Sequence, residues 1–334
     1  MKKTYYLFNP GRLQRQDNTL KFTPYDEDGN EQKPRFLPVE NIQELYCFGN
    51  LESNSALYNF LGKEQIPIHF FDYYENYTGS FMPRENLISG RMLISQVRFQ
   101  QNKKKRIDLA QRILTGAAFN MVKNLKYYNT RGKDLGVIIT SIENLSARIV
   151  DTKNIDELMG VEGNIRKNYY EAFDLIINDF DMQGRSYRPP LNEINALISF
   201  GNMMCYSQCL RTIHQTQLNP TISFLHEPGT RRFSLSLDLA EVFKPLLVDR
   251  VIFKVLNKKM IQSCDFEEKL NRILLRVNGK KAFVQAFEDR LTETINHRTL
   301  NRSVSYKHLI KLECYKLQKH ILEIEEYKPF KMWW

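Results

Sequence analysis

The sequence predicts an α+β protein, with a small N-terminal β-strand domain over residues 1–83 and a larger, mainly α-helical domain over residues 84–334. Three observations support this prediction. Short β-branched and aromatic runs, separated by turn residues, fill the first part of the chain. After Pro83, apolar residues recur at the spacing of helices. The length of 334 residues also suits about two domains.

The first domain is expected to contain four strands and one short helix. The expected strands cover residues 4–8, 20–23, 42–48 and 66–71. Turn signals such as Asn9-Pro10-Gly11 lie between them. A helix at about residues 53–63 is expected before the last strand.

The second domain is expected to consist mainly of helices. An apolar pattern at helical spacing begins at Leu87 and continues through Leu114. Further helices are expected at residues 134–150, 155–180, 191–219, 238–259, 280–291 and 306–326. Two segments, 221–226 and 273–277, are more typical of strands.

The charge of the chain favours an anionic partner. The net charge is +10 and the sequence pI is near 9.2. Nucleic acid explains such a surplus, although ribosome-like or membrane-surface binding would produce the same number. Residues 84–133 hold twelve Lys or Arg and two acids, and Lys103-Lys104-Lys105-Arg106 is the densest point. This run lacks the Glu–Lys pairing of an ordinary solvated helix, so contact with nucleic acid is the favoured interpretation.

Cysteine usage predicts a reducing environment. The five cysteines are odd in number and scattered, which does not form a disulfide framework, so a cytoplasmic location is expected. The N-terminal segment has no apolar run long enough for a signal peptide. No stretch approaches the roughly 20 apolar residues of a membrane span.

Residues 221–250 combine several groups that carry chemistry. His226 follows an apolar segment, and a turn leads into an expected helix. Asp238 and Glu241 are three residues apart, so both carboxylates lie on one helix face, where they repel unless a cation lies between them. Lys244 is three residues further along the same side. Pro245 removes the usual hydrogen-bond partner of the Glu241 carbonyl, so a kink is expected there.

A second acid stands in an open setting. Glu162 lies between Gly160 and Gly163 at an expected helix start, and small neighbours let a bulky ligand approach. A further helix carries three asparagines on an apolar face, which either brace a neighbouring loop or make ordinary structural hydrogen bonds. These are Asn192, Asn195 and Asn202.

Each feature alone has an ordinary structural explanation. A single histidine after an apolar run is usually a hydrogen-bonded core residue, and acids at helix starts commonly act as caps. The histidine, the turn, the pair Arg231-Arg232 and the two-acid helix together are more specific. Their combination indicates a site rather than a plain surface.

Together these segments resemble the signature blocks of the CRISPR-associated spacer-acquisition integrases, the Cas1 family. The three blocks appear in the family's order, at residues 159–163, at 188–190 with 195–197, and at 226–241. Shorter segments of the first domain also resemble the family, at 5–19, 38–40, 48–49 and 79–81. The ending, residues 315–330, resembles members of subtype I-B.

The resemblance implies that Glu162, His226 and Glu241 hold one divalent metal ion. Many family members carry aspartate where this chain has Glu241. Asp238 matches another acid of the family motif and is expected to be catalytic, either as a direct ligand or as a helper. Two carboxylates and an imidazole suit Mn²⁺ and tolerate Mg²⁺.

The resemblance also implies the reaction and the partners. The 3′-hydroxyl of a protospacer fragment attacks a phosphodiester of the CRISPR repeat. Both DNAs are double-stranded. The β domain is expected to serve dimerisation and partner docking, and two homodimers would flank a Cas2 dimer in a heterohexamer. Contacts to DNA are expected from basic residues and one aromatic residue, namely Arg166, Tyr187, Arg232, Lys244, Lys103, Lys104, Lys105 and Arg106.

Three other functions fit part of the sequence. A stand-alone metal nuclease would use the same residues with water as the attacking group. A non-catalytic DNA-binding scaffold would be expected to lack one of the three ligands, and this chain retains all three. An RNA-processing enzyme is compatible with the basic charge, but the sequence contains no RNA-reading motif such as an aromatic RNP sheet.

Overall fold

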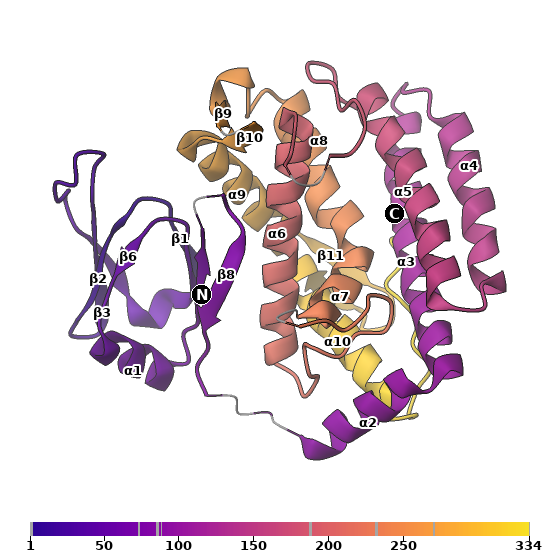
Figure 1. Cartoon of the computed structure of the whole chain (residues 1–334), viewed down its shortest axis with the longest axis horizontal. Helices are drawn as coiled ribbons and strands as arrows, with labels where there is room; N and C mark the ends of the chain where they lie inside the picture. Colours follow the sequence, from indigo (N-terminus) through magenta and orange to yellow (C-terminus); the bar gives the residue numbers. More distant parts are fainter. Residues whose placement is uncertain are drawn as a thin grey trace. The chain divides into compact units, whose positions relative to one another are not determined.

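The computed structural model describes residues 3–72, 74–84, 87, 89–186, 189–230, 233–269 and 271–333. The chain forms two compact units, Met1–Asn86 and Leu87–Trp334. Figure 1 shows a β-rich first unit and a mainly helical second unit, which confirms the predicted fold class. The boundary expected from the sequence, after residue 83, lies three residues before the division between the units.

The described residues of the first unit form two four-stranded sheets. One sheet has the order β1-β5-β7-β8, in which β8 alone is antiparallel to its neighbour. Its strands are β1(Lys3–Leu7), β5(Ile42–Cys47), β7(Ile68–Phe71) and β8(Tyr77–Phe81). The other sheet has the order β4-β3-β2-β6. Its strands are β4(Arg35–Pro38), β3(Thr19–Pro24), β2(Gly11–Gln16) and β6(Leu51–Glu52).

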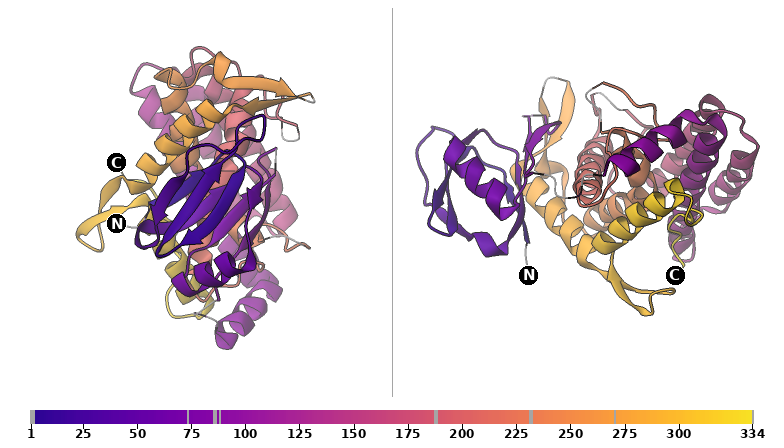
Figure 2. Two further views of the ribbon diagram at one scale, coloured as in Figure 1. Left: turned by 90° about the vertical axis from the view of Figure 1, so that its left-hand side faces the viewer. Right: turned by 90° about the horizontal axis from the view of Figure 1, so that it is seen from below.

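A common apolar core joins the two sheets and the helix α1(Ser55–Glu64). The core takes Leu13 and Leu20 from one sheet, Ile42 and Leu45 from the other, and Leu61 from α1. Figure 2 shows the two sheets as facing layers. Side chains alternate along each strand, so each sheet buries one face against the other.

Four of the eight strands were expected, and the other four were missed. The strands β2, β4, β6 and β8 are short or rich in polar residues and glycine, so their composition does not mark them. In β2, a Cβ on Gly11 would lie 2.4 Å from the Thr23 carbonyl oxygen. That glycine therefore permits the close pairing of β2 with β3.

The second unit is built from nine α-helices, a π-helical segment, short 3-10 turns and two small hairpins among its described residues. The helices are α2(Gly90–Gln101), α3(Lys103–Asn129), α4(Gly136–Ala147), α5(Ile155–Ile176), α6(Glu193–His214), α7(Ser234–Lys244), α8(Arg250–Asn257), α9(Val277–Thr292) and α10(Tyr306–Ile321). The hairpins pair β9(Phe266–Lys269) with β10(Arg272–Leu275), and β11(Thr294–His297) with β12(Arg302–Ser305). No helix in the described part of the chain is long and apolar enough to cross a membrane.

Helix α7 lies at the centre of the second unit. It packs against α3, α6 and α10, and Figure 1 shows it between α6 and α3. Nearly all of its residues are buried, including the polar Asp238, Glu241 and Lys244. A central helix with buried charged groups needs partners for each of them. These partners define the candidate site.

Two local predictions were wrong. The segment 221–226 is not a strand but an irregular loop. Glu162 lies inside α5, well past the start of this helix at Ile155. The strands β9, β11 and β12 were not expected. The expected kink at Pro245 is observed as a change from α7 to the π-helical segment η3(Pro245–Asp249).

Candidate functional site

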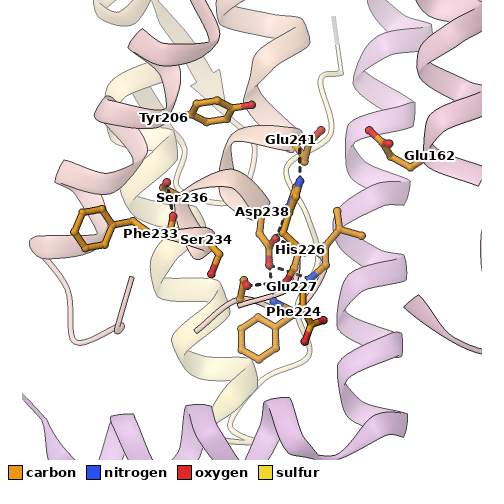
Figure 3. A network of polar contacts seen from close by, with 12 residues as sticks. Glu162, Tyr206, Phe224, His226, Glu227, Phe233, Ser234, Ser236, Asp238 and Glu241 are labelled. Carbon is orange, nitrogen blue, oxygen red and sulfur yellow. Dashed lines mark hydrogen bonds and ion pairs between the residues drawn. The ribbon is translucent and has the colours of Figure 1, made fainter. Parts of the chain in front are cut away.

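Asp238 organises the loop that carries His226. Its Oδ2 accepts the backbone N–H groups of Phe224 at 2.6 Å and Leu225 at 3.0 Å. Its Oδ1 accepts the backbone N–H of His226 at 2.9 Å and the ring Nδ1 at 2.8 Å. Figure 3 shows these bonds converging on the fully buried carboxylate. Because both oxygens already accept two bonds each, the geometry favours a helper role for Asp238 over direct metal binding.

His226 is thereby oriented toward Glu241. With Nδ1 donating to Asp238, the neutral imidazole presents Nε2 as an acceptor. This nitrogen lies 4.0 Å from Glu241 Oε1. The ring is one-fifth exposed, so a ligand can reach it from solvent. A carboxylate that fixes one ring nitrogen while the other faces a ligand position is a common arrangement at metal sites.

Glu162 joins the group from α5. Figure 3 shows its carboxylate directed toward Glu241 and His226. Arg166, one turn further along α5, contacts both Glu162 Oε1 and Glu241 Oε2. Lys244 Nζ lies 2.5 Å from Glu241 Oε1. Two basic side chains therefore balance two largely buried carboxylates.

The environment keeps Arg166 charged. Burial alone lowers the pKa of Arg166, but Tyr170, Glu162 and Tyr206 outweigh it, and the net pKa is raised. A permanent cation thus lies between Glu162 and Glu241. The sequence had instead predicted a cation between Asp238 and Glu241, and Asp238 is neutralised by four N–H donors.

The donor set fits a divalent metal ion. No three His, Cys, Asp or Glu side chains in the described part of the chain already stand close enough to hold one. The Arg166 guanidinium takes the position between the two carboxylates instead. Two carboxylates that share a cation, with an imidazole nitrogen 4.0 Å from one of them, are donor types that suit Mn²⁺ and Mg²⁺.

A cavity of about 340 Å³ opens beside Glu162. Its lining contains three basic and three acidic side chains, namely Arg166, Lys167, Arg185, Glu162, Glu171 and Asp174. Space beyond Gly160 and Gly163 is open, since a Cβ on either glycine would meet nothing within 4 Å. A ligand therefore has room next to the carboxylates, in a lining where basic and acidic side chains are equal in number.

Two of the three asparagines singled out in the sequence, Asn192 and Asn195, bond to the loop before α6 or to its first turn. Asn192 caps α6 by accepting from the Asn195 N–H at 2.9 Å. Asn195 accepts from Arg185 and Ser186 and donates to the Gly184 carbonyl. Two asparagines therefore brace the loop that borders the cavity, as one of the two interpretations proposed.

The residues expected to contact DNA occupy different settings. Lys103 and Lys104 are exposed at the start of α3. Lys105 pairs with Glu323, and Lys244 is buried against Glu241, which is unlike a surface phosphate contact. Arg166 lies between the two glutamates. Arg232 and Tyr187, with Arg231 and Arg188, fall outside the described residues.

Arg106 and Gln96 hold the loop of His226, and the sequence interpretation did not assign them this role. Arg106 Nε donates to the Phe224 carbonyl at 3.0 Å, and its NH2 group lies 2.5 Å from Glu227. Gln96 is fully buried between Met92 and Phe99 on the inner face of α2. A polar residue within a buried helical stripe was the available signal for Gln96.

Comparison with known proteins gives a consistent result. A family model described as CRISPR associated protein Cas1 matches residues 5–289. A CRISPR-associated endonuclease Cas1 from Fusobacterium nucleatum subsp. nucleatum is 47% identical over 335 residues, covering 100% of this chain and 98% of that protein. A CRISPR-associated protein Cas1 1 from Methanobrevibacter ruminantium is also 47% identical, over 100% of this chain and 99% of that protein.

Solved structures agree with the fold. A CAS1 protein from Thermotoga maritima has a TM-score of 0.85 and 37% identity, and the match covers 99% of this chain and 100% of that one. A casposase bound to integration product has a TM-score of 0.87 at 19% identity, over 99% of this chain and 93% of that one, which shows a shared fold alone. The chain therefore belongs to the Cas1 family of CRISPR-associated proteins.

Proposed function

We propose that this protein is a metal-dependent DNA endonuclease and integrase of CRISPR adaptation, which inserts spacer DNA into the repeat array. The convergence of Glu162 and Glu241 on one cation position, with His226 Nε2 facing Glu241, carries the proposal. The 47% identical relatives named as CRISPR-associated endonucleases support the same activity.

The metal ligands in this proposal are Glu162, His226 and Glu241. When bound, Mn²⁺ or Mg²⁺ would stabilise the negative charge that develops on the attacked phosphate. Asp238 holds the His226 ring with Nε2 outward. Because Arg166 contacts both glutamates, a metal ion at this position competes with its guanidinium.

The reaction is a transesterification. The 3′-oxygen of the incoming fragment forms a bond to a phosphorus of the repeat, and the bond from that phosphorus to the repeat's own 3′-oxygen breaks. The hydroxyl proton leaves the attacking oxygen, and the departing oxygen gains one. One phosphodiester replaces another, so no external energy source is needed. The cavity beside Glu162 offers room for the substrate, and the exposed Lys103 and Lys104 offer positive charge to the DNA backbone.

The partners are part of the proposal. We infer a homodimer that works with a Cas2 dimer, and two neighbours in fold are a Cas6-RT-Cas1–Cas2 complex and a partial form of it.

The resemblance of residues 315–330 supports assignment to subtype I-B. A reducing, cytoplasmic location remains a prediction from the scattered cysteines.

A joining assay tests the proposed function. A labelled fragment is mixed with repeat DNA and Mn²⁺, and the protein is tested alone and with a Cas2 partner. Joined product is expected with a 3′-hydroxyl end. It should disappear with EDTA or with a 3′-deoxy end, which removes the attacking group.

Two of the three rival functions have their own outcomes in this assay. Cutting without joining, equally efficient with the 3′-deoxy end, would identify a stand-alone nuclease. DNA binding without cutting or joining would identify a scaffold. Either result contradicts the integrase proposal.

A further inference from the structure

The loop that carries His226 has no regular secondary structure of its own. Residues 219–227 connect the end of α6 to the segment before α7, and Ser223, Phe224 and Leu225 are fully buried. Backbone groups in such a buried loop require partners from elsewhere. Side chains of α2, α3 and α7 supply them.

Gln96 of α2 holds the beginning of the loop. Its amide nitrogen donates to the carbonyls of Asn219 and Ile222, both at 2.9 Å. Its amide oxygen accepts the Asn219 N–H, also at 2.9 Å. One fully buried side chain thus makes three bonds to a segment more than 120 residues away in sequence. A loss of the amide would remove these three bonds from the buried loop, which costs stability.

Arg106 of α3 holds the end of the loop. It donates to the Phe224 carbonyl and pairs with Glu227, so it contacts residues on both sides of His226. Asp238 of α7 accepts the N–H groups of Phe224, Leu225 and His226. A guanidinium and a carboxylate from two different helices therefore both bind the short stretch from Phe224 to Glu227.

We propose that Gln96 and Arg106 are positioning residues for His226, and that Arg106 acts through the loop rather than through DNA. The side chain of Arg106 is only 15% exposed, whereas Lys103 and Lys104, next to it in sequence, are exposed. Displacement of a metal-binding ring by about 1 Å can lower a rate by roughly 100-fold. The proposal rests on the proposed role of His226 as a metal ligand.

The variants for the test are Arg106→Lys, Gln96→Met and, as a matched control, Lys104→Met. Arg106→Lys keeps the charge but loses the planar group that reaches both Phe224 and Glu227. Gln96→Met keeps the approximate volume but makes no hydrogen bonds to the loop. Lys104→Met removes one exposed charge beside Arg106 and leaves the loop contacts intact.

Three measurements separate positioning from DNA contact. Joining is measured at saturating DNA, DNA affinity by titration at several salt concentrations, and Mn²⁺ affinity by electron paramagnetic resonance. For Arg106→Lys and Gln96→Met we expect joining and Mn²⁺ affinity to fall at least about 10-fold, with DNA affinity changed less than about twofold. Lys104→Met should instead weaken DNA binding and reduce its salt dependence, with Mn²⁺ affinity and hydrogen exchange of the loop unchanged.

Hydrogen exchange of residues 219–227 tests the inference independently of the proposed function. Both positioning variants should speed exchange in this loop, while exchange in the first unit stays unchanged. If His226→Ala retained full joining, the proposed role of His226 would fail, and loop exchange would still show whether Arg106 holds the loop. The inference is overturned if Arg106→Lys leaves loop exchange unchanged, or if it behaves like Lys104→Met.

Discussion

At the residue scale, Asp238 fixes the imidazole of His226 by accepting from its ring and from three backbone N–H groups of its loop. These four bonds both stabilise the loop and orient the His226 ring. Its role was the open question of the sequence motif, in which Asp238 was either a ligand or a helper. The geometry favours the helper.

Asp238→Asn should damage both functions of this residue. The amide places an N–H₂ group against N–H donors, so some of the four bonds are lost. We expect Mn²⁺ affinity to fall about 10- to 100-fold and the free energy of unfolding to fall by about 1–3 kcal/mol. Mn²⁺ titration and urea unfolding measure these two effects. Ser234→Ala, which removes a bond to the Thr221 carbonyl but none to His226, is the control and should spare Mn²⁺ affinity. An unchanged Mn²⁺ affinity in Asp238→Asn contradicts the helper role.

Arg166 provides a second residue-scale prediction, because it contacts both glutamates of the site. Arg166→Met leaves Glu162 and Glu241 without their shared cation, so the unfolding temperature should fall in EDTA. Mn²⁺ then has no guanidinium to displace, and it should raise the unfolding temperature more in the variant than in the parent protein. Thermal unfolding with and without Mn²⁺ measures this difference. A smaller metal-dependent rise in the variant would show that Arg166 does not compete for the site.

The sequence singled out the acids and the histidine of the candidate site but not the contacts among them. Glu162, His226 and Glu241 were expected together, and Arg166 connects the two glutamates in space. The expected position of Glu162 at a helix start was wrong, since α5 begins at Ile155 under an Asn154 cap. In the sequence, Gly160 and Gly163 suggested a helix start, but the helix follows the cap at Asn154 instead. Long-range contacts such as that of Arg106 with Phe224 have no local sequence signature.

At the element scale, Pro245 changes an α-helix into a π-helical turn. A break was predicted because proline lacks an N–H group, but the type of break depends on tertiary partners. Asn124 of α3 donates to the Pro245 carbonyl at 3.2 Å. The turn also buries Asp249, and burial, opposed by Arg166 and Tyr169, raises the pKa of its carboxyl to about 6.

Asp249 should make stability depend on pH. The pKa of Asp249 in the folded protein is about 6, above its ordinary value of 3.8. The stability that the protonated carboxyl contributes to the folded state is therefore fully present below about pH 3.8 and is lost as pH rises through 6. A rise from 3.8 to about 6 corresponds to about 3 kcal/mol. Asp249→Asn should not show this loss, so its free energy of unfolding relative to the parent protein should increase from pH 4.5 to pH 7. Urea unfolding at these two pH values measures the difference. A constant difference over this range contradicts a buried carboxyl of raised pKa.

The start of α3 places like charges where a helix disfavours them. Lys103, Lys104 and Lys105 occupy the first turn, next to the positive end of the helix dipole, with Asn102 as the cap. Basic residues there cost stability, which is consistent with a role in binding. The sequence pattern of this helix start indicated DNA binding, and the structure shows that the lysines lie where the helix dipole disfavours them.

Charge reversal at Lys103 and Lys104 should therefore have two opposite effects. Acids at a helix start are favourable by about 0.3–1 kcal/mol each, so the double variant should unfold at an equal or higher temperature. Its DNA affinity should fall, and the salt dependence of binding should become weaker. Thermal unfolding and DNA titration at several salt concentrations test both effects. Unchanged DNA affinity would show that these lysines form an ordinary solvated surface and do not bind DNA.

At the scale of the whole molecule, the sequence predicted the division into a β-rich and a helical part better than it predicted the pairing of strands. Helices α4 to α10 follow apolar spacing that can be recognised locally. The parallel pairing of β1 with β5 joins segments about 40 residues apart and leaves no local signal. The final segment behaves similarly, since the Tyr327 hydroxyl and the Phe330 N–H both bond the buried Glu313.

Strand joining by variants of the three proposed ligands tests the central claim most directly. Glu162→Gln, His226→Asn and Glu241→Gln, made singly and together, are assayed with a labelled 3′-hydroxyl fragment, repeat DNA and Mn²⁺. If the three residues hold one ion, each single variant should lose joining by at least about 100-fold, and the triple variant should lose little more than the singles. Joining at the parent rate in any one of the single variants, with its fold and DNA affinity intact, would contradict a shared metal site.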